Sequence, residues 1–332
     1  MEGVKLGTRK ALIVGIDDYT VVPLNGCVSD ASDVAALLSK NDDQSVNFDV
    51  LLKTSKTNTI NKSTLKQWII DCFSGDDEIA LFYFSGHGYI DSLGGYIVTP
   101  DYAPADWGIS MQDILSIANQ SLCKNRIIIL DCCHSGYIGA INTLSQDTAV
   151  IKEGVTILTA SKSDESAMEV DNHGVFTALL LEALKGGAAD ITGNVSPGSV
   201  YAYIDRALGP WEQRPIFKTN VKRFISLRKT NPPIDMAIVR KLTNYFSDPS
   251  VKLSLDPSFE PTNDKNIEHK VIPPYSNQAN VEIFGDLQKL ESVGLVVPDG
   301  TQHMYYAAME SKSCKLTTIG QHYWHLVKSN RI

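Results

Sequence analysis

The chain has 332 residues, 43% apolar and 20% charged, so it can bury a sizeable core and wholesale disorder is excluded. With 38 acidic and 30 basic residues the net charge is −8, which disfavours binding of the whole chain to nucleic acid or anionic lipid. There is no apolar stretch of about 18 residues that would predict a membrane helix, and no signal peptide is recognised. A cytoplasmic protein with reduced cysteines is therefore expected.

Residues 1–229 alternate between apolar runs, typical of buried strands, and segments with helical spacing. The runs predict strands at 10–16, 48–52, 78–84, 126–130 and 155–159. The spacing predicts helices at 29–40, 61–73, 111–120, 175–184 and 199–208, and a small hairpin is expected at 95–99. This alternation predicts an α/β domain in which helices cover both faces of a mainly parallel sheet.

The composition changes after residue 229. Residues 230–280 are rich in proline, asparagine, aspartate and serine, which predicts a linker with one helix near 235–246. Helices are predicted again at 281–293 and 317–327, separated by two strand-like pieces, LVVP and MYYAA. This order resembles a winged-helix module. Residues 281–332, with or without the helix at 235–246, are therefore expected to form a small α+β regulatory or sensor domain.

Two of the predicted strands run directly into chemically reactive sequences. Residues 78–84 lead into Ser85-Gly86-His87-Gly88, and residues 126–130 lead into Asp131-Cys132-Cys133-His134. The carboxyl ends of parallel strands lie on one edge of a sheet, so a histidine and a cysteine can meet there if the strands are neighbours. That arrangement suits a nucleophile and its general base, with glycine amides nearby to hold an oxyanion.

Four motifs in this order, ALIVGIDDY, GCVSDA, FYFSGHG and IILDCCHSG, resemble the caspase-like cysteine peptidases, most closely the metacaspase and bacterial orthocaspase branch. Weaker matches follow in VTILTAS, GVFTALLLEAL and QRPIF, so the resemblance covers about residues 10–227. It implies the caspase–hemoglobinase fold, with Cys133 as nucleophile, His87 as base and the amides of Gly88 and Cys133 as oxyanion donors. His87 precedes Cys133 by 46 residues, near the spacing of about 50 in caspases.

The resemblance also implies which bond is cut. Metacaspases prefer arginine or lysine, and the positions of their first specificity pocket correspond to Cys27, Asp30, Ser85 and Asp131. Two carboxylates in a partly dry pocket would bind a guanidinium by charge-assisted hydrogen bonds and would disfavour aspartate. The expected partner is a protein or peptide with arginine or lysine before the cut, and no cofactor is required.

The sequence indicates less about how the peptidase is activated than about its catalytic residues. Calcium activates several metacaspases, but the candidate ligands Asp76, Asp77, Asp101 and Asp106 show no recognisable spacing. In the loop 137–154 only Lys152 is basic, so it is the predicted self-cleavage site unless a single chain is activated by loop movement. The resemblance further implies a monomer, controlled by a ligand or protein at the C-terminal module, in bacterial defence against phage.

Three alternatives stay open at this stage. Cys132, Cys133, His134 and His87 could bind zinc, although adjacent cysteines seldom share one ion. The chain could be a catalytically silent scaffold or signal-binding regulator. The module could bind DNA, but residues 231–332 carry 10 basic and 11 acidic residues, which makes nucleic acid an unfavourable partner.

Overall fold

The computed structural model describes residues 8–132, 151–160, 169–170, 173–209, 215–266 and 271–332. The chain divides into two units, residues 1–231 and 232–332, and the division lies two residues after the predicted end of the first domain. Among the described residues, no helix combines the length and the apolar character that crossing a membrane requires.

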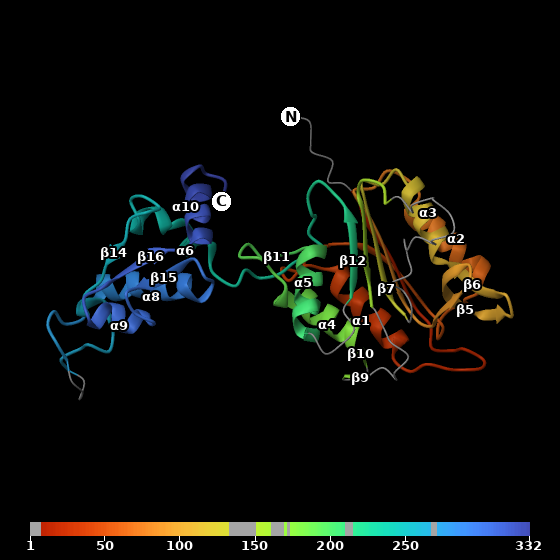
Figure 1. Cartoon of the computed structure of the whole chain (residues 1–332), viewed down its shortest axis with the longest axis horizontal. Helices are drawn as coiled ribbons and strands as arrows, with labels where there is room; N and C mark the ends of the chain where they lie inside the picture. The colour runs from red at the N-terminus through yellow and green to blue at the C-terminus, as the bar shows by residue number, and fades with distance from the viewer. Residues whose placement is uncertain (1–7, 133–150, 161–168, 171–172, 210–214, 267–270) are drawn as a thin grey trace. The chain divides into compact units, whose positions relative to one another are not determined.

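A six-stranded sheet forms the centre of the first unit (Figure 1), and its order is β12-β8-β7-β3-β1-β2. Within this sheet β1, β2, β3, β7 and β8 pair in parallel, and β12 is antiparallel to β8 at one edge. The mainly parallel sheet expected from the sequence is thereby confirmed. The strands are β1 (Arg9–Gly15), β2 (Asp49–Thr54), β3 (Ile79–Ser85), β7 (Asn125–Asp131), β8 (Val155–Thr159) and β12 (Ile216–Asn220).

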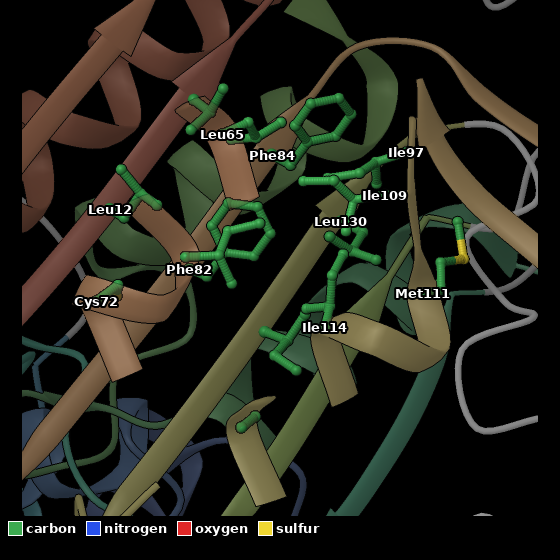
Figure 2. Close-up of a cluster of buried hydrophobic side chains, with 14 of the residues drawn as sticks. Leu12, Leu65, Cys72, Phe82, Phe84, Ile97, Ile109, Met111, Ile114 and Leu130 are labelled. Atoms are coloured by element: carbon green, nitrogen blue, oxygen red, sulfur yellow. The ribbon is translucent and has the colours of Figure 1, made fainter. Parts of the chain in front are cut away.

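Helices cover both faces of this sheet because successive strand residues point to opposite sides. Leu12 and Phe82 pack with residues of α2 and α3, whereas Ile13 and Tyr83 pack with residues of α1, α4 and α5. Figure 2 shows the first of these two clusters. The helices are α1 (Cys27–Ser39), α2 (Lys62–Phe73), α3 (Met111–Gln120), α4 (Val175–Glu182), extended by a π turn at Ala183–Gly187, and α5 (Pro197–Leu208).

Short strands surround the ends of the central sheet. Directly after β3, the chain forms a three-stranded antiparallel sheet of β4 (Gly88–Asp91), β5 (Gly94–Ala103) and β6 (Asp106–Ser110). The hairpin predicted at residues 95–99 is the middle strand of this small sheet. Two further pairs are β9 (Glu169–Val170) with β10 (His173–Gly174) and β11 (Asn194–Val195) with β13 (Arg228–Lys229).

The second unit combines helices with a small antiparallel sheet of order β14-β16-β15. Its core includes Phe246, Phe284 and Leu295, and Trp324 donates its indole proton to the carbonyl of Phe246 at 2.7 Å. The elements are α6 (Met236–Arg240), α7 (Leu242–Tyr245), β14 (Leu253–Ser254), a 3₁₀ turn (Pro257–Phe259), α8 (Gln278–Ser292), β15 (Val296–Asp299), α9 (Met304–Met309), β16 (Ser313–Leu316) and α10 (Thr318–Lys328).

The helix predicted near 235–246 is present as α6 and α7 and belongs to the second unit. Two other expectations for this region are wrong. The rest of residues 230–280 is not only a linker, because β14 and the 3₁₀ turn Pro257–Phe259 lie in it and belong to the second unit. MYYAA is the helix α9 rather than a strand, since Met304, Ala307 and Ala308 are buried at helical spacing while the tyrosines between them are exposed. A helix thus separates the paired strands β15 and β16, and a winged-helix identity stays a prediction.

Candidate active site

The two strands that lead into reactive sequences are neighbours. β3 and β7 pair in parallel, and the last pair in their register is Ser85 with Asp131. Both strands therefore end at the same edge of the sheet, and the SGHG and DCC sequences start side by side. The structure thus places His87 and residues 131–132, which directly precede Cys133, at one edge of the sheet. Cys133 itself lies outside the described residues.

His87 is held by contacts at its ring and its backbone. Its Nε2 lies 2.7 Å from the carbonyl oxygen of Val22, and its amide donates to the hydroxyl of Tyr19 at 3.0 Å. A carbonyl oxygen can only accept a hydrogen bond, so the proton of the neutral imidazole sits on Nε2. The other nitrogen, Nδ1, then carries the free lone pair that a general base needs. Val22 and Tyr19 are contacts of His87 that the sequence analysis missed.

The Tyr19 side chain fixes the start of the loop around His87. Its hydroxyl donates to the carbonyl of Val98 at 3.2 Å while it accepts from His87, and the Tyr19 and His87 rings are in contact, tilted by 59° with centroids 4.5 Å apart. A Cβ at Gly86 would lie 2.6 Å from that hydroxyl oxygen. The first glycine of SGHG is therefore required so that the backbone can pass close to Tyr19.

The amide of Gly88 points away from its neighbouring strand. Gly88 pairs with Ile97, and the flanking amide of Val98 donates to the carbonyl of His87 at 2.9 Å. This bond makes Gly88–Ile97 a non-hydrogen-bonded pair of the antiparallel ladder. Since β4 is an edge strand of its sheet, the N–H of Gly88 lies on the open side. That orientation is compatible with the oxyanion role predicted for it.

The two adjacent cysteines are in different situations. Cys132 is 1% exposed and belongs to the core cluster on the α2 and α3 face. A side chain enclosed in that cluster cannot meet a substrate, which leaves Cys133 as the candidate nucleophile. Lys152, the predicted self-cleavage site, is exposed just before β8 and donates its amide to Asn119 at 3.0 Å. It lies at the amino end of a parallel strand, so it is on the edge of the sheet opposite His87.

The four predicted specificity residues come together in what we term the acidic cluster: Cys27, Asp30, Ser85 and Asp131. Asp30 and Cys27 come from the first turn of α1, and the hydroxyl of Ser85 donates to Asp30 Oδ2 at 3.0 Å. Asp131 is the register partner of Ser85 on β7. Both carboxylates are 3% exposed, so the cluster is a buried concentration of negative charge beside the strand ends.

A chain of hydroxyls holds the second carboxylate. Thr177 on α4 donates to Asp131 Oδ2 at 2.7 Å. Tyr83 lies 2.6 Å from the Thr177 hydroxyl and, since the threonine proton is already used, Tyr83 is the donor. Burial, together with the charge of Asp131, raises the pKa of Tyr83 well above its ordinary value, so it stays a donor. Tyr83 and Thr177 were also missed as site residues, although they lie within the quoted motifs FYFSGHG and GVFTALLLEAL, because the sequence does not show that their hydroxyls meet.

Burial alters the acidity of the cluster. Removal from water, followed by the charge of Asp131, raises the pKa of Asp30 to about 6. Burial raises the pKa of the Cys27 thiol to about 12, so this cysteine is neutral and is not a nucleophile at pH 7. Asp30 is therefore ionised at pH 7 and protonated under mildly acidic conditions.

His173, which the sequence analysis did not single out, contacts the acidic cluster. Its Nδ1 lies 2.7 Å from Asp30 Oδ1 and its Nε2 lies 3.2 Å from Asp33 Oδ2. One oxygen of Asp30 thus faces His173 and the other faces Ser85.

Other acidic residues near the sheet edge or among the predicted calcium ligands have structural partners. The carboxylate of Asp17 accepts from the amide of Cys27 at 2.9 Å and so caps the start of α1. Of the predicted calcium ligands, Asp77 pairs with Lys10 at 2.6 Å, and Asp106 pairs with Lys62. Within the described ranges no three potential metal ligands gather in one place, and Cys133 and His134 of the zinc alternative lie outside those ranges.

Comparison with known proteins identifies the family. The caspase domain of peptidase family C14 matches residues 8–223, so the chain belongs to the caspase domain family. This family consists of cysteine peptidases, which implies protein substrates. None of the curated proteins matches the sequence significantly.

Two solved structures are similar to the chain at low identity. Protein GSU0716 from Geobacter sulfurreducens is 18% identical with a TM-score of 0.47, and the match covers 67% of this chain and 97% of that one. Caspase-1 from Spodoptera frugiperda is 12% identical with a TM-score of 0.47, and the match covers 68% of this chain and 92% of that one.

Proposed function

We propose that the protein is a cysteine endopeptidase of the metacaspase and orthocaspase branch that cleaves after arginine or lysine. The observation that carries this proposal is the acidic cluster at the sheet edge that presents His87. Asp30 and Asp131 would meet the substrate's basic side chain, since a guanidinium forms bidentate, charge-assisted hydrogen bonds with carboxylates. An aspartate in the same place would add a third buried negative charge, so it is disfavoured.

In the proposed reaction, Cys133 attacks the peptide carbonyl while Nδ1 of His87 accepts the thiol proton. The Val22 carbonyl keeps the imidazole in the tautomer that this step needs and stabilises the imidazolium that forms. The amides of Gly88 and Cys133 hold the oxyanion. His87 then returns the proton to the leaving amine as the C–N bond breaks, and water hydrolyses the thioester to release the acid and regenerate the thiol.

We further propose that the enzyme is a latent single chain controlled by its second unit. Lys152 lies on the sheet edge opposite His87, so cutting there would require a second molecule or a large rearrangement. His173 already contacts Asp30, so productive binding of a basic residue must displace or accommodate it. A ligand or protein bound to residues 232–332 would supply the activating signal, without a cofactor. A monomeric state and a role in defence against phage stay predictions from the family resemblance.

The test compares hydrolysis of peptides with arginine, lysine or aspartate before the cut. Wild type should cleave the basic peptides, and Cys133→Ala should cleave none. Asp30→Asn should lose activity on the basic peptides, whereas Asp18→Asn, which changes an exposed aspartate near the same edge, should not. Preferred cleavage after aspartate would refute the proposed specificity. Silence of wild type toward every peptide, with and without calcium, would leave two options, a latent enzyme that awaits its signal or the scaffold alternative.

A further inference from the structure

A second feature adjoins His87 and has no part in the chemistry described above. A cavity of about 180 Å³ is lined by His87, Gly88 and the rings of Tyr19, Tyr89, Tyr102 and Trp107, together with two valines. The Tyr89 and Trp107 rings lie 3.9 Å apart and the Tyr102 and Trp107 rings lie 6.1 Å apart, measured between centroids. We term this the aromatic cavity.

The aromatic cavity and the acidic cluster lie on opposite faces of the central sheet. Tyr19 and Val98 belong to the core cluster packed by α2 and α3, and Tyr102 packs against that cluster. Asp30 is on α1 and Thr177 is on α4, and both of these helices pack on the other face. His87 follows the strand between these faces. A peptide with its basic side chain in the acidic cluster and its scissile bond at His87 would therefore continue toward the aromatic cavity.

The direction of the peptide follows from the chemistry of His87. The imidazole must donate its proton to the leaving amine, so the residue that carries this amine lies beside the ring. The aromatic cavity is lined by that same ring. Because its walls are mainly aromatic and aliphatic, it suits an apolar side chain. Its size is sufficient for one, since an apolar protein cavity of ~150 Å³ can hold benzene.

We propose that the aromatic cavity is the subsite for the residue immediately after the cleaved bond, and that it takes leucine, methionine or phenylalanine. This inference rests on the proposed function. Full burial of such a side chain should raise kcat/KM roughly 10- to 100-fold relative to a peptide with glycine in that place. Tyr89 is 37% exposed and lies at the rim, so its truncation should weaken the subsite with little effect on the fold.

The experiment uses peptides that differ only at the residue after arginine, which is leucine, phenylalanine, glycine or aspartate. A peptidyl-arginine methyl ester is the control, because it keeps the arginine side of the cleaved bond and has no residue after it. The methyl ester has a leaving group too small to fill the cavity. For wild type, kcat/KM for the leucine or phenylalanine peptide should exceed that for the glycine peptide by about tenfold or more. Tyr89→Ala and Trp107→Ala should bring this ratio toward one, and Tyr275→Ala, at an exposed tyrosine of the second unit, should leave it unchanged.

Binding of the uncut peptides to Cys133→Ala gives a readout that does not require turnover. The arginine–leucine peptide should bind about tenfold more tightly than the arginine–glycine peptide, and Tyr89→Ala in that background should remove the difference. Turnover of the methyl ester combined with equal rates for all peptides would overturn the subsite while leaving the proposed function intact. Equal binding of all four peptides by Cys133→Ala, or no binding at all, would also overturn the subsite. Failure to hydrolyse the methyl ester counts against the proposed function itself.

Discussion

Asp30 offers a sharp test because the buried negative charge that it needs for its proposed role in substrate binding should reduce the stability of the fold. Its pKa is about 6 in the folded chain, raised by burial and then by Asp131, against about 3.9 in an unfolded chain. A carboxyl whose folded pKa is raised contributes stability below its unfolded pKa, and this contribution is lost as the pH rises through its folded pKa. The difference between these two pKa values corresponds to roughly 3 kcal/mol of folding stability lost between pH 4 and pH 8.

Asp30→Asn removes the ionisation while keeping the shape of the side chain. The groups that face Asp30 are His173, Ser85, Cys27 and Asp131, and all of them stay in place. The variant should therefore gain stability relative to wild type as the pH rises. The difference between their free energies of unfolding, variant minus wild type, should be about 3 kcal/mol larger at pH 8 than at pH 4. At the same time kcat/KM for arginine peptides should fall roughly 10- to 100-fold, the value of a charge-assisted hydrogen bond.

The assay is denaturant unfolding followed by tryptophan fluorescence at several pH values. Three of the four tryptophans precede residue 232, so the signal reports mainly on the first unit. Asp18→Asn is the matched control, because this exposed aspartate should show no such pH dependence. A difference between Asp30→Asn and wild type that is constant with pH, or that favours wild type at pH 8, would refute the reasoning.

Three further changes have definite expected outcomes. His173→Ala should lower KM for arginine peptides several-fold with a smaller change in kcat, because it frees one oxygen of Asp30; an unchanged or higher KM in steady-state assays would contradict this. Gly15→Ala should destabilise the first unit by about 1–3 kcal/mol in denaturant unfolding, since its Cβ would lie 2.2 Å from the carbonyl oxygen of Cys27. Gly320→Ala, whose Cβ would lie 1.9 Å from the Leu295 carbonyl oxygen, should destabilise the second unit; if that unit restrains the peptidase, hydrolysis should then rise.

The sequence predicts the central elements of the first unit well because their signals are local. In the run 78–84 every residue after Glu78 is apolar or aromatic, and this run becomes the fully buried β3, so its strand character needs no tertiary information. β12 was not predicted because only Ile216 and Phe217 in it are apolar, as suits a partly exposed edge strand. In the second unit, MYYAA is rich in tyrosine, which favours a strand locally, but burial at helical spacing decides the outcome.

The candidate site likewise contains residues that local motifs predict and contacts between residues that lie far apart in the sequence. His87, Gly88 and the acidic cluster follow from motifs at strand ends, and the parallel sheet brings them to one edge. His173 lies 143 positions from its partner Asp30, so no local pattern could reveal the contact. The contact of Val22 with His87 uses a backbone carbonyl, which every residue has, and therefore leaves no trace in the identity of the side chain.

The hydrogen-bond donors to Asp30 and Asp131 explain how the acidic cluster can keep the negative charge that binding of a cation would require. Ser85 donates to Asp30, and Thr177, with Tyr83 behind it, donates to Asp131. Hydroxyl groups satisfy and orient a carboxylate without cancelling its charge, whereas an arginine or lysine in the same positions would neutralise it. The negative charge thus persists in a buried place, which raises the pKa of Asp30 and reduces stability above pH 6. A bound guanidinium would remove this penalty, so the instability that the buried charge causes in the free state would become a source of the proposed selectivity for basic substrates.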